Sequence, residues 1–206
     1  EIALFERNPT FYGPKPHIKG FGLRMFANDD ALVSAMKSGE LDALETVPPT
    51  AIDTLKKDGV IVTKVPGVTT NDFIFNANTK KPKHRELLNL KLREAFAHAI
   101  DRDKIVQVAW LGTAQPATSF IPPSTGDWHN PNLKPESFDL AEANRLLNEL
   151  GYKKGSGGIR SADGHKMSYD VITPNDLTGV DRTFQIIQAD FQKIGVQLKQ
   201  RSLDSS

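Results

Sequence analysis

Residues 91–112, KLREAFAHAIDRDKIVQVAWLG, carry the most regular apolar pattern in the chain. Its first half has apolar residues at the three- and four-residue spacing of one helix face, namely Leu92, Ala95, Phe96, Ala99 and Ile100. Asp101 fits the N-cap of a second helix, whose own apolar stripe, before a stop at Gly112, is Ile105, Val106 and Ala109. The stretch contains no cysteine or serine nucleophile, so we predict two amphipathic helices that pack on a core and do no chemistry.

The sequence before this stretch predicts short strands that alternate with short helices. Alternating or β-branched apolar runs bounded by Gly, Pro or Asn predict strands at residues 1–7, 18–26, 40–47, 60–65 and 69–76. Asp29 or Asp30 fits the N-cap of a helix that ends at Gly39, and Thr50 fits the N-cap of one that ends at Gly59. Residues 78–89 are polar and rich in lysine, so we place the boundary between two lobes there.

The sequence after the stretch begins with a long Pro-rich connector, residues 113–138. Asp139 and Glu142 have capping-box spacing at the start of a helix that ends at Gly151. Asp163 and Gly164 suit the turn of a β-hairpin. A helix at about 180–194 ends at Gly195, and residues 196–201 form a strand. The alternation of strands and helices predicts an α/β or mixed α+β fold.

Composition excludes several classes of protein. The chain has 26 Lys and Arg against 25 Asp and Glu, for a formal net charge of +1, and lacks the basic patch of a nucleic-acid-binding protein. It has no cysteine, which excludes disulfides, Cys-ligated zinc, iron–sulfur clusters and thiol nucleophiles. No run of about eighteen apolar residues predicts a membrane span. The first residues, EIALF, look like a strand already under way, so we expect an excerpt from a longer protein.

Catalytic signatures are weak. The 5 histidines are spread along the chain without HExxH or another ligand-like spacing: His17, His84, His98, His129 and His165. His98 lies away from the apolar face of its helix, and we expect it to be exposed to solvent. The glycines of residues 155–160, GSGGIR, lack a phosphate-loop pattern and are interpreted as a flexible turn. There is no GxSxG elbow, so we expect no catalytic residue, metal site or cofactor.

Aromatic residues in the connector allow two interpretations. Phe120, Trp128 and Phe138 lie among prolines, and Asp127 and His129 flank the tryptophan. Such aromatics commonly anchor a loop to the body of a protein, whereas Pro-stiffened aromatic loops also line ligand clefts. A second candidate is residues 173–179, TPNDLTG, where a strand gives way to a helix and backbone N–H groups suit a carboxylate or other anion.

Several segments together resemble the family 5 solute-binding proteins, the dipeptide, oligopeptide and nickel receptors of ABC importers. RNPTFYGPKP at residues 7–16 is similar to the Arg-Asn-Pro-x-Tyr-Trp-Gly-Gly-Lys-Pro signature of that family, with Phe11 and Tyr12 in place of Tyr-Trp. The other similar segments follow in the family's order, namely residues 29–44, 74–82, 92–117, 138–152 and 186–199. Residues 92–117 resemble its Val-Arg-Gln-Ala-x-x-x-Ala-Ile-Asp-Arg helix pair.

The resemblance implies a type II periplasmic-binding-protein-like fold, with an excerpt that covers part of both lobes. Residues 1–78 would belong to lobe 1 and end in the strand that crosses between the lobes, and residues 79–206 would belong to lobe 2. It implies a receptor that closes around a peptide or similar small polar solute without chemistry and delivers it to ABC permease subunits. It also implies a monomeric, extracytoplasmic protein, lipid-anchored or secreted, with no nucleic-acid partner.

We expect ligand contacts from five residues. Phe73 and Asn76 lie on the presumed crossing strand, although Phe73 also suits core packing. Asp127 could pair with an α-amine, Trp128 could form an apolar wall, and Asn175 could orient a backbone or carboxylate group. Two other functions stay open: a hydrolase with an unrecognised acid pair, and a scaffold that binds a partner through the Pro-rich connector.

Overall fold

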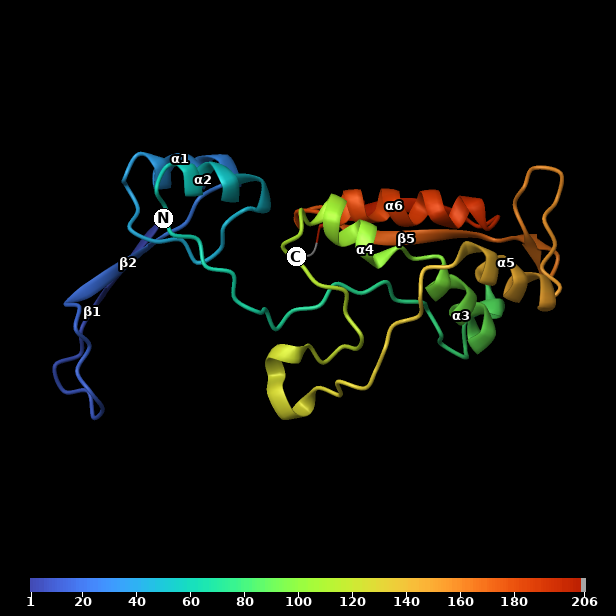
Figure 1. The fold of residues 1–206 in the computed structure, drawn as a ribbon, viewed down its shortest axis with the longest axis horizontal. Coiled ribbons are helices and arrows are strands. Elements are labelled where there is room, and N and C mark those ends of the chain that lie inside the picture. Colours follow the sequence, from blue (N-terminus) through green and yellow to red (C-terminus); the bar gives the residue numbers. More distant parts are fainter. Residues whose placement is uncertain (205–206) are drawn as a thin grey trace. The chain divides into compact units, whose positions relative to one another are not determined.

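The computed structural model describes residues 1–204 and divides into two compact units, Glu1–Thr63 and Lys64–Ser206 (Figure 1). Among the described residues, no helix is both long enough and apolar enough to cross a membrane. The division at Thr63 follows from the contacts among the residues of this chain and does not by itself define the lobes of the whole protein. The assignment of residues 1–78 and 79–206 to two lobes of a larger protein stays a prediction.

Unit 1 contains one two-stranded ribbon and two helices. Strands β1 (Ile2–Glu6) and β2 (Gly20–Arg24) pair antiparallel with Leu4 opposite Gly22. Both strands are exposed along their whole length, and the rings of Phe5 and Phe21 stack across the ladder at 4.9 Å. The ribbon confirms the two strands predicted at the start of the chain.

The helices of unit 1 occur where the sequence places them, but their caps differ. Helix α1 (Asp29–Lys37) is capped by Asn28, whose side chain accepts the Ala31 N–H, so the expected caps Asp29 and Asp30 instead lie in the first turn. Thr50 lies inside the 3₁₀ turn η1 (Pro49–Ala51), which runs into α2 (Ile52–Lys57) without a side-chain cap. Gly39 and Gly59 have the left-handed backbone expected of helix stops.

Unit 2 is built on a β-α-β crossover. Strands β5 (Ser168–Pro174) and β6 (Gln197–Leu203) pair parallel, with α6 (Val180–Lys193) between them in sequence and beside β5 in Figure 1. Helices α3 (Leu90–His98) and α5 (Leu140–Glu149) contribute buried residues to the same core. The strand and helix predicted after residue 168 are confirmed.

The core of unit 2 confirms the opening helix prediction. Leu92, Ala95, Phe96, Ala99 and Ile100 are all buried. The Phe96 ring contacts Phe191 of α6 at 5.0 Å and Phe75 at 5.6 Å. Asp101 caps the short helix α4 (Arg102–Lys104) by accepting the Lys104 N–H, and a π-helical turn, η3 (Ile105–Ala109), follows. The second apolar stripe, Ile105, Val106 and Ala109, is only partly buried.

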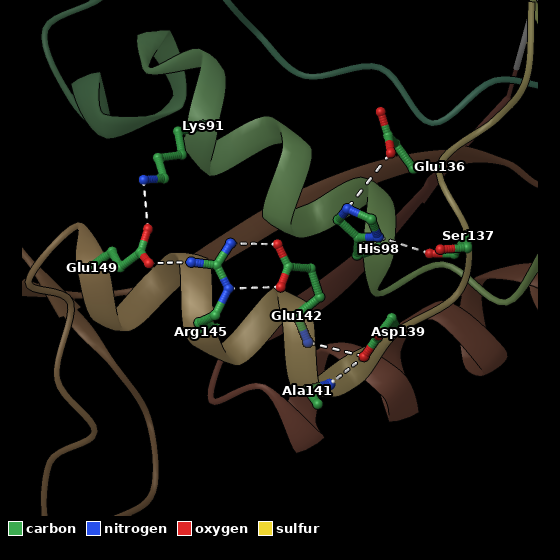
Figure 2. Close-up of polar contacts among 9 residues, drawn as sticks. All are labelled: Lys91, His98, Glu136, Ser137, Asp139, Ala141, Glu142, Arg145 and Glu149. Atoms are coloured by element: carbon green, nitrogen blue, oxygen red, sulfur yellow. Dashed lines mark hydrogen bonds and ion pairs between the residues drawn. The ribbon is translucent and has the colours of Figure 1, made fainter.

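Polar contacts join α3, α5 and the connector (Figure 2). Asp139 caps α5 as predicted, whereas Glu142 pairs with Arg145 and does not complete a capping box. Arg145 also pairs with Glu149, and Lys91 of α3 donates to the other Glu149 oxygen at 2.6 Å. The Lys91–Glu149 pair joins the two helices, and each of these exposed pairs adds little stability in water.

His98 corrects an expectation. Its side chain is 14% exposed and Nδ1 lies 2.8 Å from the Ser137 carbonyl oxygen, while Nε2 lies 3.5 Å from Glu136. The His98 ring points away from the apolar face of α3, as the pattern indicates, but residues 136 and 137 of the connector cover it. The helix pattern alone could not foresee that cover.

A buried arginine holds the hairpin against the helices. Arg160 precedes β3 (Ser161–Ala162), which turns through Asp163 and Gly164 into β4 (His165–Lys166) as predicted. The Arg160 residue is 2% exposed, and its side chain donates to the carbonyl oxygens of Ile194 and Tyr152 and to the side-chain oxygens of Asn144 and Asn148. Burial lowers the pKa of Arg160. The GSGGIR segment is thus a turn, as interpreted, that leads to a structural arginine.

Three predicted strands do not form. Residues 41–48 contain bends, and residues 60–78 contain no strand among their described backbone. A strand needs a neighbour for its N–H and C=O groups. No part of residues 1–204 pairs with these segments in a ladder, so a correct apolar pattern does not produce a sheet here.

Candidate functional site

The connector residues Asp127 and Trp128 lie in the 3₁₀ segment η4 (Pro123–Trp128), which contains a left-handed Gly126. The Ser124 hydroxyl donates to the Gly67 carbonyl oxygen at 2.6 Å, and His129 Nδ1 lies 2.7 Å from the Ile121 carbonyl oxygen. Hydrogen bonds to backbone oxygens therefore position the segment that carries Trp128.

The connector aromatics do not anchor it within the described chain. Trp128 is 81% exposed and Phe120 is 70% exposed. Phe138 is also exposed. The anchoring interpretation is therefore wrong for residues 1–204. Ligand contact by Asp127 and Trp128 stays a prediction.

Phe73 and Asn76 lie on an extended segment near the start of unit 2. The Phe73 ring packs edge-on against Phe75 at 5.1 Å and Phe191 at 5.8 Å, which is the core role left open for it. Asn76 is exposed, its side chain accepts the Asn78 N–H at 3.0 Å, and its carbonyl oxygen accepts from Lys81 Nζ at 2.9 Å. Phe73 is thus half-buried in the core, while Asn76 stabilises a turn. Ligand contact by either residue stays a prediction.

Asn175 lies at the carboxyl end of β5. Its backbone N–H donates to the Leu203 carbonyl oxygen at the end of β6, and its side chain is exposed. Gly179, with a left-handed backbone, precedes α6. In open sheets of parallel strands, ligands bind outside the carboxyl ends of the strands. The position of Asn175 therefore suits ligand contact. Apart from the chain neighbours Asp127 and Trp128, the described contacts join none of the five candidates to another.

One polar cluster escaped the sequence analysis. Glu86, in the 3₁₀ turn η2 (Arg85–Leu88), is buried and accepts from the Tyr169 hydroxyl at 2.8 Å, with His84 and His165 also at its carboxylate. Burial raises the pKa of Glu86, but hydrogen bonds from Tyr169, its own backbone N–H and the two histidines outweigh burial and lower the pKa overall. Burial and the same carboxylate raise the pKa of Tyr169.

Solved structures define the class of fold. NikA from Brucella suis, solved with Fe(III)-EDTA, matches all of this chain with a TM-score of 0.79 and 26% identity, and the match covers 41% of NikA. NikZ from Campylobacter jejuni, solved with Ni(L-His), matches with a TM-score of 0.82 and 22% identity over 40% of NikZ. The chain therefore has the mixed helix-and-sheet fold of part of a type II periplasmic binding protein, as the sequence analysis expected.

The chain belongs to the bacterial extracellular solute-binding proteins of family 5, whose middle-region family model matches residues 1–206. Protein XP55 of Streptomyces lividans is 30% identical over 196 residues, which are 95% of this chain and 35% of XP55. The dipeptide-binding protein of Escherichia coli (strain K12) is 27% identical over 191 residues, 92% of this chain and 33% of that protein. The chain thus spans about a third of the length of these relatives.

Proposed function

We propose that the whole protein is the solute-binding receptor of an ABC importer and that it takes a peptide or a similar small polar solute by lobe closure. The family match over residues 1–206 carries this proposal. Relatives named for dipeptide and glutathione binding support a solute of that size and polarity. A ligand that binds the closed form more tightly than the open form shifts a two-lobed receptor toward the closed form. This function needs no reactive group.

The proposal includes the setting in which such a receptor works. It delivers the solute to permease subunits of the importer, acts outside the cytoplasm as a monomer, and is held there by a lipid anchor or secreted. The interspersed charges and the net charge of +1 give no reason to add nucleic acid as a partner.

Trp128 supplies a first test in the full-length protein. Calorimetric titration with di- to pentapeptides, glutathione and nickel chelates should identify a solute, which also raises the melting temperature. Trp128→Ala should then weaken binding about tenfold or more, since buried aromatic anchors dominate many binding energies. Phe120→Ala is the matched control, because it removes another exposed aromatic of the same connector. Equal losses in the two variants would contradict a specific role for Trp128.

Asp127 supplies a test of ligand chemistry. If its carboxylate pairs with an α-amine, Asp127→Asn should weaken the binding of peptides with a free α-amine. The affinity for N-acetylated peptides of the same sequence should not change. Bound peptides should be recovered intact after incubation. Hydrolysis would favour the enzyme alternative, and binding to protein partners without any solute would favour the scaffold alternative.

A further inference from the structure

Residues distant in sequence converge on the Glu86 carboxylate. His84 Nδ1 and His165 Nε2 each lie 3.2 Å from Glu86 Oε1, and the Tyr169 hydroxyl donates to the same oxygen at 2.8 Å. Glu86 is only 4% exposed. Its turn η2, the hairpin strand β4 and the strand β5 therefore meet at one charged oxygen within unit 2.

The donor atoms have the types and spacing of a metal site. One ligand atom from each of His84, Glu86 and His165 lies within 4.8 Å of the others. Zn²⁺ binds imidazole nitrogen and carboxylate oxygen at about 2.0–2.2 Å in a tetrahedral arrangement, which separates neighbouring ligand atoms by roughly 3.4 Å. Both histidine-to-carboxylate distances, 3.2 Å, are close to that separation. Only the two imidazoles need to adjust toward each other.

The second carboxylate oxygen independently indicates a cation. Glu86 Oε2 is buried and has no hydrogen-bond partner among the described residues. His84, His165 and Tyr169 all bond to Oε1, so these three side chains leave Oε2 without a partner. An unsatisfied buried charge is costly. An ion bound by both carboxylate oxygens would satisfy Oε2, which the hydrogen bonds to Oε1 do not.

We propose that His84, Glu86 and His165 bind a divalent transition-metal ion, with Zn²⁺ as the ion that this donor set favours. Two imidazoles and one carboxylate suit zinc and leave a fourth position for water. Tyr169 donates a hydrogen bond to the carboxylate, as outer-shell donors commonly do at metal sites. This site is separate from the solute-binding residues proposed above and does not depend on them.

The surroundings give the ion a path and limit its affinity. The cluster opens on a depression of about 530 Å³ whose lining includes Pro82, Asp163 and the two histidines. Lys83, Arg85 and Lys166 also line it, and their charges oppose a cation. We therefore expect reversible binding that is weaker than in a closed structural zinc site.

Metal binding would have a mechanical effect. His165 and Glu86 are 79 positions apart in the sequence. An ion that bridges them would fasten the β3–β4 hairpin to the turn before α3. Because the unfolded chain does not assemble the three ligands, binding should stabilise unit 2.

Zinc content of the full-length protein tests the proposal. The protein is purified without a histidine tag, stripped with EDTA and dialysed against Zn²⁺, and its metal content is measured by mass spectrometry. His165→Ala should lower the zinc content by one equivalent, because it removes one of the three ligands. The His165 side chain is 37% exposed, so its removal leaves no cavity in the core and the variant should fold. Glu86→Gln should lower the zinc content in the same way, and Tyr169→Phe should weaken zinc roughly ten- to a hundredfold.

His129→Ala is the matched control, because that imidazole contacts only a backbone oxygen in the described chain. Its zinc content should equal that of the parent protein, and circular dichroism should show all variants folded. Co²⁺ should give the visible absorption of a four-coordinate site in the parent and lose it in His165→Ala. A parent protein without zinc, or a folded His165→Ala variant that keeps every equivalent, would overturn the proposal.

Discussion

Arg160 offers the most direct test of how unit 2 is held together. Its guanidinium donates to the Ile194 carbonyl oxygen at 2.7 Å and to the Tyr152 carbonyl oxygen, with no carboxylate partner among the described residues. Arg160→Met keeps the apolar stem and removes every donor. Of the two asparagines that it also contacts, Asn148 is exposed and can turn toward water, but the backbone oxygens cannot move.

The size of the effect follows from those two carbonyl groups. Each buried acceptor left without a donor costs about 1–3 kcal/mol, so Arg160→Met should lower the free energy of unfolding by roughly 2–6 kcal/mol. For a chain of this length the melting temperature falls about 2–4 °C per kcal/mol. Urea unfolding followed by circular dichroism measures the first quantity, and calorimetry the second.

Arg182→Met is the matched control for this substitution. Arg182 is exposed on α6 and donates to the Val108 carbonyl oxygen at 3.3 Å. Its loss should change stability by less than about 0.5 kcal/mol. If Arg160→Met were as stable as Arg182→Met, the guanidinium would be solvated in the native state, and the argument from buried acceptors would be refuted.

Two further predictions concern the core and the surface of unit 2. Phe96→Ala should cost about 3–5 kcal/mol in urea unfolding, because the ring is buried between α6 and the extended segment, and a loss below about 1 kcal/mol would mean that the ring is exposed in solution. Hydrogen bonds from Arg145 lower the pKa of Glu142, and those from Lys91 lower the pKa of Glu149. Their folded pKa values lie below the unfolded values, so the stabilisation is present above about pH 4.5 and is lost as the pH falls through the folded values. Arg145→Ala should therefore lose less stability, relative to the parent chain, at about pH 3 than at about pH 6, and a pH-independent difference would contradict the assigned contacts.

Local features were predictable from the sequence because their causes are local. Gly39, Gly112 and Gly195 have the left-handed backbone that their positions after helical patterns predicted, and Asp101 and Asp139 cap as expected. A cap depends on its own side chain and the next three N–H groups, and a helix face depends on residues one turn apart. Such interactions need no knowledge of the rest of the fold.

Features that depend on distant partners were not predictable. The strands expected at 60–65 and 69–76 have suitable side chains but no ladder partner in the described chain. The Glu86 cluster was missed because its partners lie far apart in the sequence. His84 and His165 come to the same carboxylate only when the β3–β4 hairpin folds back onto η2. No spacing rule within either segment predicts that approach.

The two units differ in the size of the buried core that stabilises each of them. Unit 2 has a closed core in which Leu92, Leu147 and Phe191 are fully buried. In unit 1, Leu4 and Leu23 on the β1–β2 ribbon are exposed, and a two-stranded ribbon without a covered face is marginally stable in water. Cooperative unfolding of the 206-residue chain should therefore report mainly on unit 2. The substitutions of Arg160 and Phe96 are informative because both side chains lie in that unit, where a change in a buried contact appears directly in the measured transition.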